Sequence, residues 1–238
     1  MIFTEDEVRS CYEFSQNMIG NHRQDKVMRR EEWEIFRDDF RGKLGEVILA
    51  KYIQMNFPDA IMDEGVDYSI KPVGEWDTSD LIVNGKYISV KSVKQRSNFL
   101  MIEKSRYNEQ GEYCYKNNDE EDVKIDFYVL VRVSVDPDMS KDAMSYNCIK
   151  DLVEKHKISA DILGGISHSE FWRKKHEAKK GIKCIFKNLK ALCDGDNTVL
   201  ERPTGREDKT QILQQDNYIL YKNELIRVEE ILEEVVAQ

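Results

Sequence analysis

The amino-acid sequence predicts an α/β protein of the α+β kind, in which helices flank a mixed central β-sheet. Three observations favour this class. One long segment has apolar residues at helical spacing, an Asn-Gly pair separates two short extended segments, and residues 125–135 are apolar on both faces of a strand. The 238 residues are 40% apolar, which is enough to bury a core. Because no linker rich in Gly, Ser or Pro interrupts the chain, we expect one domain over residues 1–238.

The N-terminal part is predicted to be helical. The run Thr4-Glu5-Asp6-Glu7 has the capping-box pattern, and Gly20 is a typical helix stop. We interpret residues about 1–30 as a helical N-terminal elaboration. A second helix is predicted from about Glu31 to Ile53. Its apolar residues recur every three or four positions, at Phe36, Phe40, Leu44, Val47, Ile48 and Tyr52.

Residues 80–91 predict a β-hairpin. Asn84-Gly85 suits the two positive φ angles of a type I′ turn, so the numbers of cross-strand partners should sum to 169. Asp80 then lies opposite Ser89. Because side chains alternate along a strand and cross-strand partners share a face, Asp80, Ser89 and Lys91 should lie on one face.

The rest of the chain alternates between strands and helices. A strand that is apolar on both faces, as residues 125–135 are, is typical of a central strand covered by helices on each side. Gly164-Gly165 is interpreted as a turn, and residues 98–122 give no clear pattern. The remaining predicted elements are helices at 145–157, 169–180 and 225–236 and a strand at 217–221.

Charge and residue usage exclude several classes of protein. With 36 Lys and Arg against 45 Asp and Glu, the net charge of −9 argues against coating nucleic acid through bulk charge. No apolar run is long enough for a membrane span, and the N-terminus lacks signal-peptide order, so we expect a cytoplasmic protein. The five cysteines form no CxxC pair and the four histidines lack ligand spacing, so no zinc site is indicated.

The hairpin and the second helix carry a set of groups suited to phosphate chemistry. Two carboxylates within reach of one another, such as Asp80 and Glu46, repel, and Mg²⁺ removes that cost while binding oxygen ligands. A nearby ammonium, such as that of Lys91, can position a water and stabilise charge on a phosphate oxygen. Together these groups describe hydrolysis of a phosphodiester. The alternative is that Asp80 and Lys91 form an ion pair on a solvated hairpin face, contributing only about 0.2–1 kcal/mol.

A predicted helix followed by a predicted hairpin carries three short segments. The helix contains Gly42-Lys-Leu-Gly-Glu46, and the hairpin contains Ser79-Asp80-Leu-Ile-Val83 and Ile88-Ser-Val-Lys91. Over roughly residues 40–135 this pattern resembles the PD-(D/E)xK nuclease superfamily, and within it the type II restriction endonucleases. The resemblance implies a restriction-endonuclease-like core with the order helix, hairpin, helix and central strand. It assigns catalytic roles to Glu46, Asp80, Ser89 and Lys91, and Mg²⁺ binding to Glu46, Asp80 and the carbonyl of Val90.

One residue departs from the family pattern. Ser89 stands where the family usually has Asp or Glu, and a hydroxyl is a neutral and weaker Mg²⁺ ligand. Glu46 is then more necessary for holding the metal, and Ser89 would assist orientation. Asp77 is a rival for the metal-binding role, but we choose Asp80 because the hairpin pairing places it opposite Ser89.

Two glycines in the predicted helix add a second clue. Gly42 and Gly45 each cost about 1 kcal/mol relative to Ala inside a helix. Their presence predicts that something approaches the helix closely beside Glu46. Either the sheet or a DNA backbone beside the site, or simple packing of the helix on the sheet, would explain them.

Residues 171–190 are the most basic part of the chain. They hold eight lysines and arginines against one acid, Glu177, which favours a surface that contacts phosphates over a merely solvated helix face. We assign them to a C-terminal DNA-contacting region of about 139–238. The DNA-binding residues that we predict are Lys94, Arg96, Arg173, Lys174, Lys175, Lys179, Lys180 and Lys183.

The sequence thus leads to the expectation of a Mg²⁺-dependent type II restriction endonuclease that hydrolyses phosphodiester bonds of double-stranded DNA at a specific short site. The resemblance implies a homodimer, since a two-fold dimer matches a palindromic site. It also implies a cognate DNA methyltransferase in the host, not held in a stable complex. The alternatives are a structure-specific or repair DNA nuclease of the same superfamily, and a non-catalytic DNA-binding domain whose site has decayed through Ser89.

Overall fold

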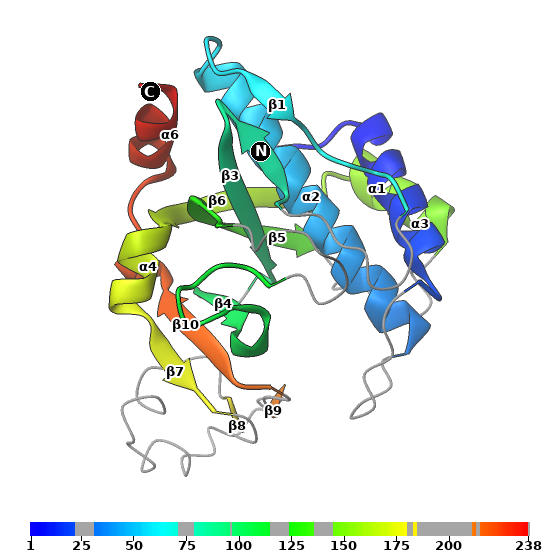
Figure 1. Cartoon of the computed structure of the whole chain (residues 1–238). Helices are drawn as coiled ribbons and strands as arrows, with labels where there is room; N and C mark the ends of the chain where they lie inside the picture. The colour runs from blue at the N-terminus through cyan, green and yellow to red at the C-terminus, as the bar shows by residue number, and fades with distance from the viewer. Residues whose placement is uncertain are drawn as a thin grey trace.

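The main sheet of the protein is mixed, which confirms the predicted α+β class. A computed structural model describes residues 1–21, 31–70, 79–95, 97–114, 124–135, 145–179, 183–184, 211–212 and 215–237. Its five-stranded sheet has the order β1-β2-β3-β5-β6, with β3 and β5 parallel and the other neighbours antiparallel (Figure 1). The bounds of these strands are Met62–Glu64, Leu81–Val83, Lys86–Val93, Phe127–Val135 and Ile158–Ser167.

The other elements surround this sheet. A second sheet has the order β4-β10-β7 (Phe99–Glu103, Asn217–Tyr221 and His176–Ala178), and β8 (Lys183–Cys184) pairs with β9 (Gln211–Ile212). The described α-helices are α1 Glu5–Met18, α2 Glu32–Asn56, α3 Tyr146–Glu154, α4 His168–Lys174 and α6 Val228–Val236. Short 3-10 turns lie at η1 Lys104–Arg106 and η4 Lys222–Glu224. None of the described helices has the length and apolar character needed to cross a membrane.

Local sequence signals explain several of these elements. The capping box before α1 is present, with Glu7 N donating to Thr4 Oγ1 at 3.2 Å and Thr4 N donating to Glu7 Oε2 at 2.6 Å. The hairpin has the predicted register, with Ile82 opposite Tyr87 and Val83 opposite Lys86. Its turn residues Asn84 and Gly85 have φ angles of 47° and 69°, as a type I′ turn requires.

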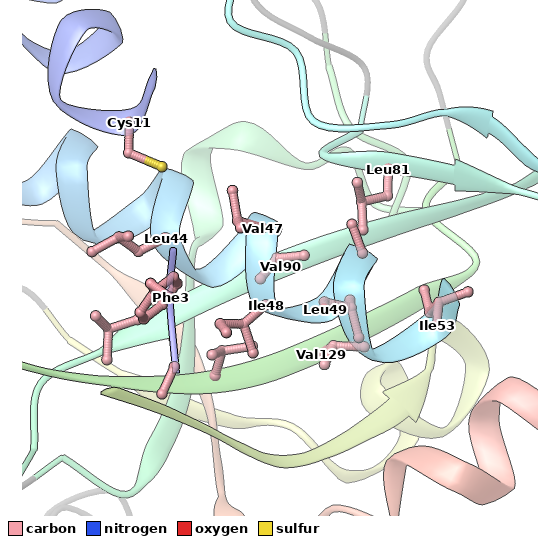
Figure 2. Close-up of a cluster of buried hydrophobic side chains, with 14 of the residues drawn as sticks. Phe3, Cys11, Leu44, Val47, Ile48, Leu49, Ile53, Leu81, Val90 and Val129 are labelled. Carbon is pink, nitrogen blue, oxygen red and sulfur yellow. The ribbon is translucent and has the colours of Figure 1, made fainter. Parts of the chain in front are cut away.

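The two faces of the main sheet are covered differently. Figure 1 shows α1, α2 and α3 grouped on one side, and Figure 2 shows Leu44, Ile48 and Leu49 of α2 in one cluster with Val90 and Val129. The opposite face carries a second cluster that includes Tyr128 and Leu130 of β5. This second face is covered by α4 and by strands β4 and β10, rather than by helices alone.

Three sequence predictions need correction. The predicted helix at 169–180 ends at Lys174, because His176–Ala178 pairs with β10 as strand β7. Gly164-Gly165 is part of β6 and not a turn. Gly164 has φ 140°, and a Cβ there would lie 2.6 Å from the Ile226 carbonyl oxygen, so close backbone approach explains the glycine.

The third correction concerns the link between the hairpin and the central strand. The family resemblance implies a helix there, but β4 and η1 are the elements found between β3 and β5 in the described residues. Residues 115–123 of this link lie outside the described part of the chain. The strand at 217–221 and the helices within 145–157 and 225–236 are confirmed.

Candidate metal-dependent active site

Asp80 lies where β2 and β3 separate, and its carboxylate is fixed to β3. The Val90 N–H donates to Asp80 Oδ2 at 2.6 Å, and the Ser89 hydroxyl donates to the same oxygen at 3.1 Å. The Asp80 N–H donates to the Ile88 carbonyl at 3.1 Å. Asp80 and Ser89 therefore meet, as the hairpin arithmetic predicts, and one carboxylate oxygen holds both donors.

The backbone of Val90 faces the same point. In a strand, the N–H and C=O of one residue point to the same neighbour, and the Val90 N–H points to Asp80. The β2 pairing ends at Ile88, so β2 supplies no ladder partner for the Val90 carbonyl. A carboxylate and a carbonyl oxygen are consequently aimed at one place in the plane of the sheet, which is the type of ligand that Mg²⁺ accepts.

Lys91 and Ser89 lie on the face of β3 that is turned away from α2. Ile88 and Val90 pack in the cluster that contains α2, whereas Tyr87 and Val93 pack with the opposite cluster. Because side chains alternate, Ser89 and Lys91 belong to the second face. Their partners on β5, Tyr128 and Leu130, are also in the second cluster.

Glu46 comes from α2, over the other face of the sheet, at the level of this same stretch of β3. The preceding residue, Gly45, sits directly on β3, since a Cβ there would overlap with Ser92 Oγ and lie 3.3 Å from Ser92 Cβ. The close approach predicted from the glycines is therefore that of the sheet. Gly42 shows no neighbour within 4 Å in the described residues.

The Glu46 carboxylate is buried and pairs with a lysine of the same helix. Its residue is 7% exposed, and Lys43 Nζ lies 2.7 Å from Glu46 Oε2. The charge of Glu46 acts on two nearby groups, Cys11 of α1 and Tyr68. Burial raises the pKa of Cys11 to about 12 and also raises that of Tyr68, and Glu46 adds to both effects. The structure thus places Glu46 beside β3 from one face, and Asp80, Ser89 and Lys91 along β3 at its edge and second face.

Two buried hydroxyl groups that flank this stretch have no hydrogen-bond partner among the residues that the structure describes. They are Ser79 Oγ, next to Asp80, and Ser92 Oγ, against Gly45. Among the described residues, no group of three or more His, Cys, Asp or Glu side chains could hold a metal. The Asp80 carboxylate and the Val90 carbonyl are oxygen ligands of the kind that Mg²⁺, which usually keeps several waters, accepts. The rival Asp77 lies outside the described residues.

A pair of tyrosines near Asp80 was not predicted from the sequence. Tyr107 and Tyr113 form a β-bridge and an edge-on ring pair, 5.5 Å between centroids, in the segment after η1. Burial, then neighbouring Tyr128, raises the pKa of Tyr107, and Asp80 contributes to this shift. Burial also raises the pKa of Tyr113, with Asp80 adding to the effect. No motif marks these tyrosines in the sequence, because their closeness to Asp80 depends on the tertiary fold.

Of the predicted DNA-binding residues, Arg173 and Lys174 lie in the last turn of α4, and Lys175 and Lys179 lie on either side of β7. Arg173 and Lys174 pair with Glu170 at 2.6 and 3.1 Å, and Lys179 pairs with Glu177 at 3.1 Å. Such exposed pairs contribute only about 0–1 kcal/mol, so phosphates could compete for these cations.

The other predicted contacts differ in their surroundings. Lys175 packs over the Trp172 ring at 4.6 Å and Lys94 is exposed. Arg96 and Lys180 lie outside the described residues, and Lys183 is described only as part of β8.

The comparisons with known proteins give no match. No family model fits this chain, and neither the curated proteins nor the solved structures contain a match to it.

Proposed function

We propose that this protein is a Mg²⁺-dependent endonuclease that hydrolyses phosphodiester bonds of double-stranded DNA, acting as a type II restriction enzyme. The observation that carries the proposal is the attachment of the Asp80 carboxylate to Ser89 and Val90 at the point where β2 leaves β3. This contact supports the assignment of the hairpin as a PD-(D/E)xK site, with Ser89 in place of the usual acid.

Each residue of the proposed site has a separate role in binding the metal or in catalysis. Asp80, the Val90 carbonyl and Glu46 would hold Mg²⁺, and Ser89 keeps the Asp80 carboxylate in position through its hydroxyl. When bound, Mg²⁺ supplies a more acidic water and neutralises charge on the scissile phosphate. Lys91 would orient the attacking water and stabilise the negative charge that develops on phosphate oxygens.

The surroundings of the site support DNA as the substrate. The aromatic residues Tyr107 and Trp172, 5.7 Å apart between ring centroids, lie on the same face of the main sheet as Ser89 and Lys91. Trp172 belongs to α4, whose last turn carries Arg173 and Lys174. Basic side chains on the helix that packs against this face are suited to contacts with the DNA phosphates that flank the scissile bond.

Digestion of supercoiled plasmid DNA tests the proposal. With Mg²⁺ we expect discrete fragments from the wild type, and loss of cleavage by about 10²-fold or more in Asp80→Ala and Lys91→Ala. Lys86→Ala, at the other end of β3, is the matched control and should cleave normally. Fragments without fixed ends would favour a structure-specific or repair nuclease. No cleavage by the wild type would favour the non-catalytic DNA-binding alternative.

A further inference from the structure

Glu177, the one acid among the basic residues 171–190, bridges two lysines at the second sheet. Its Oε1 lies 3.0 Å from Lys104 Nζ, and its Oε2 lies 3.1 Å from Lys179 Nζ. Lys104 lies 73 residues earlier in the chain and meets Glu177 because β4 and β7 both pair with β10. Hydrogen bonds from Lys104, then from Lys179, hold the pKa of Glu177 below its usual value. Glu177 is therefore ionised at neutral pH, and each of its carboxylate oxygens faces one ammonium group.

Lys175 differs from these two lysines, because no acidic side chain in the described part of the chain pairs with it. Its ammonium donates to the Trp172 carbonyl at 3.0 Å and lies over two rings, 4.6 Å from the centroid of Trp172 and 5.1 Å from that of Tyr218. Lys104 Nζ lies 5.3 Å from the centroid of the same Tyr218 ring. Attraction to the aromatic faces holds these ammonium groups in place, so less side-chain freedom is lost when an anion binds them.

The three lysines lie on the side of the main sheet that carries Lys91, since the rings that two of them contact belong to the cluster on that face. The side chains of Lys104, Glu177 and Lys179 are 37%, 44% and 60% exposed, so a large ligand can reach them. Two ammonium groups around one carboxylate are also suited to binding two oxygens of a phosphate. Because exposed lysine–carboxylate pairs are weak, a polyanion can displace Glu177.

We propose that Lys104, Lys175 and Lys179 form a surface that binds the phosphate backbone of duplex DNA, and that Glu177 occupies the place of one phosphate and weakens this binding. The choice of DNA as the partner rests on the proposed function, but the surface acts without metal. When DNA binds, its phosphates replace the Glu177 carboxylate on the two lysines, and counterions are released from the DNA. The displaced carboxylate stays close by on β7 and repels the phosphates.

The pair of Asp151 and Lys155 provides matched controls on the other side of the molecule. Lys155 Nζ lies 2.8 Å from Asp151 Oδ2, and both side chains are 61% exposed. Asp151 belongs to α3, whose Ile149 packs in the cluster on the opposite face of the main sheet. Asp151→Asn and Lys155→Gln therefore change the net charge as the test variants do, but away from the proposed surface.

Fluorescence anisotropy of a labelled DNA duplex of random sequence tests the surface. The full chain is titrated into the duplex in EDTA, which prevents metal-dependent cleavage, at NaCl concentrations from about 50 to 200 mM. We expect Lys175→Gln to bind about three- to tenfold more weakly than the wild type and to lower the slope of log K against log [NaCl] by about 1. Lys175→Arg keeps the charge and should bind like the wild type. Circular dichroism checks the fold of each variant.

Glu177→Gln should have the opposite effect. It frees two ammonium groups, so we expect binding that is about three- to tenfold tighter at low salt, with a steeper salt dependence. This gain should disappear when Lys104 and Lys179 are also replaced by Gln. Asp151→Asn and Lys155→Gln should bind like the wild type.

Failure of this inference can be told apart from failure of the proposed function. The surface is refuted if the wild type does not bind the duplex, or if Lys175→Gln and Glu177→Gln bind like the two control variants, whether or not the protein cleaves DNA. If the expected binding pattern is found but Mg²⁺ brings no cleavage, the surface stands and the nuclease activity is refuted.

Discussion

Gly45 sets the distance between α2 and β3 at the level of Glu46. A side chain at residue 45 would overlap with Ser92 Oγ, and Val131 Cβ would lie only 3.6 Å from its Cβ. Glycine inside a helix costs about 1 kcal/mol, so its presence here indicates that the close approach is worth more than that cost. Gly42, one turn earlier, meets no such neighbour in the described residues.

This difference predicts opposite effects for two similar substitutions. Gly45→Ala should lower the free energy of unfolding by about 1–3 kcal/mol, because it forces α2 away from β3. Gly42→Ala should leave it unchanged or raise it by up to about 1 kcal/mol through helix propensity. Urea denaturation measures both.

A double variant shows whether the collision with Ser92 is the cause. Ser92→Ala removes the oxygen that the new methyl group would meet, so Gly45→Ala combined with Ser92→Ala should recover part of the lost stability. Strictly additive effects would mean that the strain at Gly45 lies elsewhere.

At the scale of elements, α4 is attached to the central strand through its first residue. The His168 N–H donates to the Asp126 carbonyl at 2.8 Å, and the His168 ring stacks on Tyr128 of β5. Burial, then the nearby Lys124 ammonium, holds the pKa of His168 below its usual value of 6.5. The neutral imidazole is therefore the form that docks α4 on the sheet.

This docking predicts a pH dependence with a definite sign. A folded-state pKa below 6.5 means that the contribution of His168 to stability is complete above about pH 6.5. As the pH falls below 6.5 the unfolded chain takes up the proton first, so this contribution is lost progressively until the pH has passed the folded-state pKa. Between pH 6.5 and 5, the wild type should lose stability relative to His168→Gln, which does not titrate. A difference in the free energy of unfolding between the two proteins that stays the same at every pH would contradict this role of His168.

Sequence patterns predicted those elements whose signals are local. The capping box of α1, the Asn-Gly turn and the apolar period of α2 each lie within a few residues, and the structure confirms all three. The contact between Asp80 and Ser89 followed from the hairpin register alone. The helix predicted over residues 169–180 was too long. His176 is not helical because it pairs with β10, about forty residues further on in the chain.

At the scale of the whole molecule, the candidate site draws on segments that no local pattern connects. Tyr107 and Tyr113 pair with each other just after η1, and β4, which precedes η1, pairs with β10 near the end of the chain. Lys43 is visible in the sequence, three residues before Glu46, but its burial depends on α1 packing against α2. Hydrophobic periodicity shows which face of a helix is buried and gives no information on which charges are buried with it.

The proposed site requires that Glu46 of α2, over one face of the main sheet, and Asp80, at the point where β2 and β3 separate, share one cation. A crystal of the protein soaked with Mn²⁺ and measured at the manganese absorption edge tests this most directly. We predict an anomalous peak bonded to the Asp80 carboxylate and the Val90 carbonyl, with Glu46 bound directly or through one water. A peak elsewhere, or none at Asp80 with Mn²⁺ present, would contradict it.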